Sequence, residues 1–125
     1  MKRSERKKWI DKCRVLIRKQ KIKLYGNRCQ FCGSNKQVGL FHILSVGAYP
    51  RLELYEDNIL LACWFGCHHK WHHDFYYARD VIEPKIIKIL GKNYEQDLKD
   101  VYNTLPKLGL MRIKEIYEEL KEKDK

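Results

Sequence analysis

Cys29-Gln30-Phe31-Cys32-Gly33 and Cys63-Trp64-Phe65-Gly66-Cys67 are two cysteine pairs from which the fold can be predicted. Thirty residues separate Cys32 from Cys63. Two thiolate pairs on turns can supply the four ligands of one tetrahedral zinc ion without straining either backbone segment. Four thiolates leave no open coordination position, so the pattern predicts a structural zinc rather than a catalytic one. The alternative is a set of four buried hydrophobic thiols.

The residues around these pairs predict an α+β domain. Residues 37–45 look extended, a loop that contains Leu52 and Leu54 follows, and residues 59–63 form a second apolar strand. Helical spacing predicts helices over residues 4–24, 67–79, 94–103 and 110–122, and a short one from Pro84 to Gly91. In the first helix Trp9, Cys13, Leu16, Ile17 and Leu24 form the apolar face.

At 125 residues the chain has the length of one domain. We divide it into a basic N-terminal helix (1–25), a zinc-stapled core (26–80) and C-terminal helices (81–125). The pattern of the C-terminal helices fits packing on the core and fits a dimer surface, so the sequence leaves the oligomeric state open.

The positive charge is concentrated at the start of the chain. The net charge is +10, and residues 1–25 hold eleven Lys or Arg against two acids, so this segment alone carries +9. Such asymmetry is typical of an arm that binds a phosphate backbone. We expect contacts from Lys7, Lys8, Arg14 and Arg18, and from Arg51 in the loop between the strands. The alternative is a solvated face that only keeps the protein in solution.

Four of the five histidines lie in Cys67-His68-His69-Lys70-Trp71-His72-His73. On a helix His68 and His72 share one face, which suits two imidazoles that bind one metal ion. His69 and His73 form a second such pair about 100° around the helix, and we interpret them as surface residues.

The cysteine pairs, the Phe41-His42-Ile43 strand, the Glu56-Asp57-Asn58 step before the apolar strand and Cys67-His68-x3-His72 occur in one order. In that order they resemble the HNH endonuclease family, and the last segment looks like the variant common among small phage-type members. The resemblance covers residues 29–75. It implies a ββα-metal (HNH or His-Me finger) core, a hairpin and a helix around a catalytic metal, beside a separate four-cysteine zinc site.

The resemblance also implies roles for individual residues. His42 would be the general base that activates water, Asn58 would tie the loop and help to orient the base, and His68 and His72 would hold the catalytic metal across from His42. Phe41 stands where many members carry another metal ligand. A site dominated by imidazole favours Mn²⁺, Ni²⁺ or Zn²⁺ over Mg²⁺.

The expected function is therefore metal-dependent hydrolysis of phosphodiester bonds in DNA, most readily double-stranded DNA. A zinc-stapled module that binds DNA or RNA without cutting it is the alternative. Either kind of protein can serve as an accessory of phage packaging or recombination proteins.

The longest apolar run, residues 59–65, is too short to span a bilayer, and no apolar segment of a secretion signal follows the basic start. We expect a cytoplasmic protein, in the host cytoplasm if it is phage-encoded, whose cysteines stay reduced. Cys13, the fifth cysteine, is expected to be a small buried hydrophobe.

Overall fold

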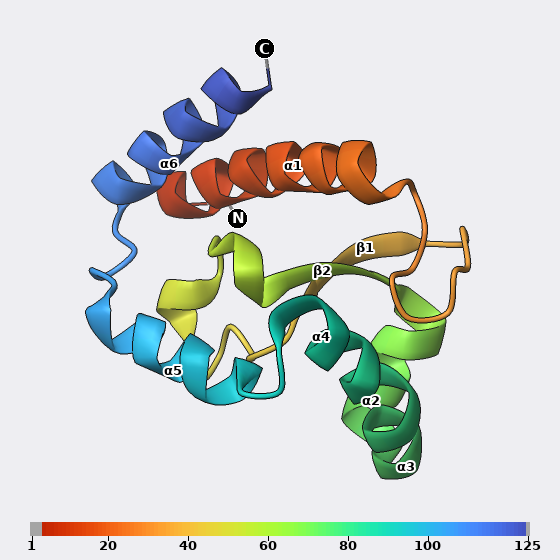
Figure 1. Cartoon of the computed structure of the whole chain (residues 1–125). Helices are drawn as coiled ribbons and strands as arrows, with labels where there is room; N and C mark the ends of the chain where they lie inside the picture. Colours follow the sequence, from red (N-terminus) through yellow and green to blue (C-terminus); the bar gives the residue numbers. More distant parts are fainter. Residues whose placement is uncertain (1–3, 125) are drawn as a thin grey trace.

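The computed structural model describes residues 4–124 and shows a two-stranded antiparallel sheet between two groups of helices (Figure 1). The strands are β1 (Val38–His42) and β2 (Ile59–Cys63). Helix α1 (Glu5–Tyr25) precedes them. The other helices and helical turns are η1 (Pro50–Leu52), η2 (Glu56–Asn58), η3 (Trp64–His68), α2 (His69–His73), α3 (Phe75–Tyr77), η4 (Ala78–Ile82), α4 (Glu83–Leu90), α5 (Tyr94–Thr104) and α6 (Leu110–Lys123).

Both ends of α1 carry the signals expected from the sequence. The Ser4 hydroxyl accepts a hydrogen bond from the backbone N–H of Lys7 at 3.1 Å, which satisfies one of the free N–H groups of the first turn. At the other end Gly26 has φ 82°, a conformation that residues with a Cβ rarely adopt. The helix is therefore fixed locally at residues that the sequence identifies.

The buried face of α1 consists of Ile10, Cys13 and Ile17, at spacings of three and four residues. Trp9 and Leu16 pack against them at the edge of this face. The expectation for Cys13 is confirmed, because it is fully buried and its thiol donates to Ile113 O at 3.6 Å. The expectation for Leu24 is wrong. Its side chain is 74% exposed in the last turn of the helix.

The side chains of the hairpin lie on its two faces. Val38 pairs with Cys63, Leu40 with Leu61 and His42 with Ile59. Successive side chains of a strand point to opposite faces. Leu40 and Leu61 accordingly join the cluster beneath α1, whereas Phe41 joins the cluster on the other side, which η3 and the helices after it cover.

The helix expected over residues 67–79 is broken into pieces. Helix α2 ends at His73, and Asp74 has φ −128° and ψ 96°, which is outside the helical region. The Asp74 carboxylate then caps the next segment by accepting from Tyr77 N at 3.0 Å. The prediction of one continuous helix is wrong because this local side-chain cap competes with helix continuation.

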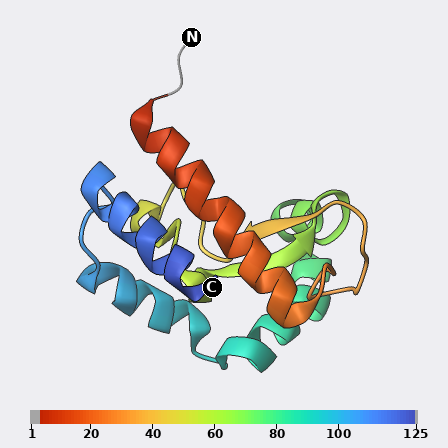
Figure 2. The same ribbon diagram turned by 90° about the horizontal axis from the view of Figure 1, so that it is seen from above.

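The C-terminal helices pack within the chain. Helix α6 lies beside α1 and runs in the same direction (Figures 1 and 2), with the Arg6 guanidinium donating to Leu108 O and the Gln20 amide to Leu120 O. Ile113 and Leu120 of α6 are buried. Helix α1 is thus an integral part of the fold and not a separate arm.

Candidate metal centre and the histidine cluster

The first cysteine pair lies on a tight turn that is attached to β2. Gly33 takes φ 79°, and its N–H donates to Cys29 O at 2.9 Å, which closes the turn. Gln30 attaches the turn to the open edge of β2. Its backbone N–H donates to Leu61 O, and its side-chain oxygen accepts from Leu61 N, each at 2.8 Å. This edge of the strand therefore finds hydrogen-bond partners without a third strand.

The second pair is built on the end of β2 and on η3. Five residues form a π-helical turn, Trp64–His68, which contains one residue more than an α-helical turn. Three residues separate Cys63 from Cys67, one more than separate Cys29 from Cys32, and this turn accommodates the additional residue. Cys67 N donates to Cys63 Sγ at 3.2 Å. The turn also favours glycine at position 66 for steric reasons, because a Cβ there would lie 2.8 Å from Cys63 Sγ.

All four sulfur atoms converge. The Sγ atoms of Cys29, Cys32, Cys63 and Cys67 lie within 4.8 Å of one another, and the Sγ atoms of Cys32 and Cys63 are 3.6 Å apart. Zinc–sulfur bonds of 2.3 Å in a tetrahedron place neighbouring sulfurs about 3.8 Å apart. A disulfide would bring two sulfurs to about 2.05 Å, and all five cysteines are free. The cluster is therefore positioned to hold a metal ion such as zinc.

The surroundings of the cluster shift the pKa values of its thiols in different directions. Burial raises the pKa of the Cys67 thiol well above its usual value, so its thiolate requires compensating positive charge. Backbone hydrogen bonds act in the opposite sense at Cys29. Burial alone would raise its pKa, but these bonds, including that from Phe31 N at 3.4 Å, outweigh burial and lower it. The Tyr77 hydroxyl lies 3.3 Å from Cys67 Sγ and supports that ligand from outside.

His42 lies at the end of β1 on the side that faces α1. Its Nε2 is 2.8 Å from Glu53 O. A carbonyl oxygen only accepts, so Nε2 carries the proton and Nδ1 keeps its lone pair. Burial has the largest effect and lowers the pKa of His42. The hydrogen bond to the Glu53 carbonyl raises the pKa, the Arg14 charge lowers it, and the Glu53 carboxylate raises it. The neutral imidazole is the favoured form.

Asn58 connects the two ends of the loop between the strands. Its side chain is fully buried. The amide oxygen accepts from Leu44 N at 2.8 Å, and the amide nitrogen donates to Leu44 O at 3.0 Å and to Leu52 O at 3.5 Å. One side chain thus holds the loop on both sides, directly beyond His42.

The structure brings His68 and His72 together but leaves them without a third protein ligand. Their ring centroids are 5.5 Å apart. Burial, and then the charges of His72 and His42, lower the pKa of His68, so His42 is near enough to act on it electrostatically. Among residues 4–124 the only group of three or more metal-ligating side chains is the cysteine cluster.

Phe41 occupies the space that an additional ligand would need. Its fully buried ring packs against His68 and Trp71, with centroid distances of 5.5 and 5.7 Å. His42, one residue further along the strand, projects from the opposite face of β1. At this position an apolar ring, rather than a further metal ligand, therefore faces His68.

Three of the five arginines and lysines expected to bind phosphate have partners inside the fold. Arg14 pairs with the Glu53 carboxylate at 4.0 Å, and Arg18 donates to Val38 O at 3.0 Å. Arg51 donates to Tyr102 O and Leu105 O and lies over the Tyr102 ring. The two lysines extend into solvent, and Arg18 is also exposed despite its hydrogen bond. The lysines form exposed ion pairs within α1, Lys7 with Asp11 at 3.4 Å and Lys8 with Glu5 at 3.9 Å.

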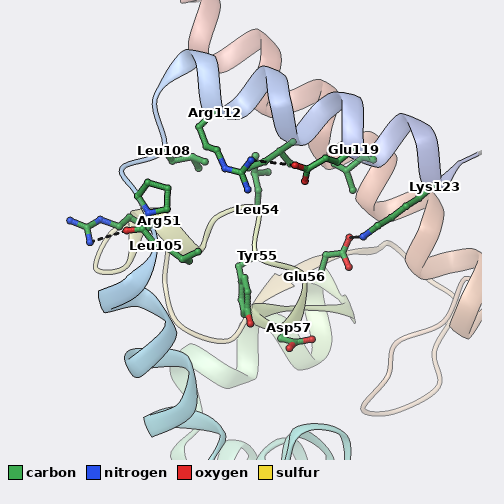
Figure 3. Close-up of a pocket in the computed structure, with 13 residues that line it drawn as sticks. Arg51, Leu54, Tyr55, Glu56, Asp57, Leu105, Leu108, Arg112, Glu119 and Lys123 are labelled. Carbon is green, nitrogen blue, oxygen red and sulfur yellow. Dashed lines mark hydrogen bonds and ion pairs between the residues drawn. The ribbon is translucent and has the colours of Figure 1, made fainter.

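A pocket of about 340 Å³ lies between the loop after β1 and helix α6 (Figure 3). Its floor is apolar, with Leu54, Leu105 and Leu108 among the lining side chains. Two ion pairs lie among its lining residues, Arg112 with Glu119 at 3.3 Å and Lys123 with Glu56 at 3.5 Å. It contains neither cysteine nor histidine. The pocket is therefore separate from the metal centre and from the histidine cluster.

Four supporting residues were not identified from the sequence: Gln30, Glu53, Gly66 and Tyr77. The position of Gly66, directly before a ligand cysteine, was a usable signal because close backbone approach often requires glycine. The contacts of Glu53 and Tyr77 are long-range and carry no local pattern.

Comparison with protein-family models, with curated proteins and with solved structures gives no match to this chain. Within residues 4–124 no helix is long and apolar enough to cross a membrane.

Proposed function

We propose that the four-cysteine cluster binds a structural zinc ion and that the chain is a metal-dependent endonuclease acting on DNA. The observation that carries the proposal is the state of His42. Its proton is directed to Glu53 O at 2.8 Å, which leaves Nδ1 as a proton acceptor. A general base requires a neutral imidazole in a fixed position. Asn58 holds the loop that directly follows the strand carrying His42.

In this proposal His42 Nδ1 takes a proton from a water molecule whose oxygen attacks the phosphorus of a phosphodiester. The bond from phosphorus to the leaving oxygen breaks, and that oxygen is protonated by solvent. General-base catalysis of this kind contributes roughly 10²–10⁴-fold. A divalent ion held by His68 and His72 would neutralise charge on the phosphate and on the leaving oxygen.

The zinc would act at a distance from this chemistry. Cys63 ends β2 and Cys29 lies on the turn that Gln30 joins to the same strand. A metal ion on these thiolates would fix the strand to η3 and so set the position of His68, which follows Cys67 directly. Its role would be to hold the hairpin and the histidine segment in one geometry.

A second candidate is a zinc-stapled nucleic-acid-binding module without cleavage activity, working as an accessory subunit of a phage packaging or recombination complex. The observation that favours it is Phe41. A fully buried phenylalanine ring lies against His68, and no third protein ligand joins His68 and His72 in residues 4–124. A metal would then depend on water and substrate phosphate for its remaining ligands.

Plasmid nicking with two substitutions at one position separates these candidates. His42→Gln keeps a side-chain donor for Glu53 O but has no basic nitrogen, whereas His42→Ala removes both. Incubation with supercoiled DNA and Mg²⁺, Mn²⁺ or Ni²⁺ should show nicking by the unaltered chain and none by either variant. Zinc content and thermal melting of His42→Gln should be unchanged. Nicking by His42→Gln at the original rate would contradict the assigned base. DNA binding without nicking under every metal would support the second candidate.

The contribution of α1 to DNA binding can be tested without deleting this helix, which is part of the core. The double variant Lys7→Gln/Lys8→Gln removes two exposed charges and leaves the buried face intact. If both lysines contact phosphates, the slope of log K against log [salt] should fall by about 1 per lysine. Lys92→Gln, an exposed lysine outside α1, is the matched control and should leave the slope unchanged. An unchanged slope in the double variant would show that this end of α1 does not contact DNA.

A further inference from the structure

The second histidine pair, His69 and His73, has the closer geometry of the two. These residues are the first and last of α2, four positions apart on one face of the helix. Their ring centroids are 4.4 Å apart and the ring planes differ by 33°, compared with 5.5 Å and 42° for His68 and His72. The His69 and His73 rings therefore already lie side by side.

Both rings are also accessible, whereas in the other pair only His72 is exposed. His69 and His73 are exposed, whereas His68 is half-buried against Trp64 and Phe41, at centroid distances of 4.4 and 5.5 Å. An ion from solvent can reach the exposed pair without displacing a packed side chain.

The charges nearby do not oppose a cation. The Lys70 ammonium lies over the Tyr77 ring, 4.3 Å from its centroid, and so is held by another element. Asp74, directly after His73, brings a carboxylate whose Oδ1 accepts from Tyr77 N. The segment thus places two imidazole rings close to an acidic residue.

We propose that His69 and His73 form a separate surface site for one borderline transition-metal ion of the Zn²⁺, Ni²⁺ or Cu²⁺ class. These ions bind imidazole nitrogen at about 2.0–2.1 Å, so two adjacent ligands on one ion lie about 3 Å apart. Small rotations of rings that already lie 4.4 Å apart bring their nitrogens to that separation. Mg²⁺ and Ca²⁺ prefer oxygen ligands and are excluded as the ion of this site.

The site would be open. No third His, Cys, Asp or Glu joins His69 and His73 among residues 4–124, so water or an oxyanion completes the coordination shell. This arrangement differs from the cysteine cluster, in which four thiolates surround the ion. The site requires neither DNA cleavage nor a role for His42, and so goes beyond the proposed function.

Calorimetric titration of the zinc-loaded chain with Ni²⁺ tests this inference. His69→Ala/His73→Ala should bind one Ni²⁺ fewer than the unaltered chain, and His68→Ala/His72→Ala should keep the binding event that the first variant loses. The cysteine zinc must remain at one equivalent in all samples, because this shows that the variants fold. Equal stoichiometry and affinity in the unaltered chain and in His69→Ala/His73→Ala would overturn the proposal.

The same titration keeps this inference apart from the proposed function. If His68 and His72 also bind metal, the His69→Ala/His73→Ala variant retains one Ni²⁺ event, and if they do not, it retains none. Single variants add a further requirement. Either His69→Ala or His73→Ala alone should lose the chelate, and full affinity in one of them would contradict a site that uses both imidazoles.

Discussion

Substitution of Asn58 by alanine removes the side chain that holds the loop between the strands, and its cost follows from the contacts. The variant loses the bond from Leu44 N at 2.8 Å and the bonds to Leu44 O at 3.0 Å and Leu52 O at 3.5 Å. Each buried backbone group left without a partner costs about 1–3 kcal/mol. Two such groups on Leu44, partly reached by water, give about 2–4 kcal/mol.

That loss is large beside the stability of a small domain, about 5–15 kcal/mol. The assay is urea denaturation of the zinc-loaded protein, followed by the fluorescence of its tryptophans. We expect Asn58→Ala to lower the free energy of unfolding by about 2–4 kcal/mol without changing the slope of the transition. Asn103→Ala, an exposed asparagine in α5, should stay within about 0.5 kcal/mol of the unaltered chain.

Asn58→Asp provides the sharper comparison, because its side chain has nearly the same shape. The carboxylate can still accept from Leu44 N, but its second oxygen faces the Leu44 and Leu52 carbonyls without a proton to donate. We therefore expect no rescue. A loss below about 1 kcal/mol in Asn58→Ala, or full stability of Asn58→Asp, would refute the role given to these hydrogen bonds.

Two further predictions concern the metal centre and His42. Gly66→Ala should cost about 1–3 kcal/mol and weaken zinc retention against a chelator, because the new methyl group meets Cys63 Sγ at 2.8 Å, whereas Gly47→Ala enters open space and should change neither. Zinc retention by Gly66→Ala equal to that of the unaltered chain would contradict the packing at the second cysteine pair. Burial lowers the pKa of His42 in the folded state, so the unfolded chain binds its proton first as the pH falls below about 6.5, and stability should decrease. His42→Gln should lose less stability than the unaltered chain between pH 7 and 5 in denaturation experiments, and equal losses would show that His42 is not the group that titrates.

The sequence predicts those features of the fold and site whose signals lie within a few neighbouring residues. The cysteine spacing predicts the cluster because the two ligands of each pair lie within one turn of the chain. The structure brings all four sulfurs within 4.8 Å of one another. The strands and the cap at Ser4 are local in the same sense. The sequence also places Asn58 directly before the second strand, where the structure finds it.

Most features that the sequence does not show depend on contacts between distant segments. Nothing near Arg14 or Arg18 in the sequence shows that Glu53 and the Val38 carbonyl will occupy their side chains. Packing between distant segments also decides which cluster each face of the hairpin joins, because Phe41 lies in the cluster covered by η3 and Leu40 lies in the cluster beneath α1. The break at Asp74 results from a side-chain cap that competes closely with helix continuation.

We propose that four thiolates hold one zinc ion, which joins the hairpin to the segment that carries the histidines. X-ray absorption spectroscopy of the purified chain, together with its metal content, tests this most directly. We predict one zinc per chain with four sulfur neighbours at about 2.3 Å. Zinc surrounded by nitrogen and oxygen at about 2.0 Å would contradict the claim. A folded chain that contains no zinc and has four titratable thiols in the cluster would contradict it as well.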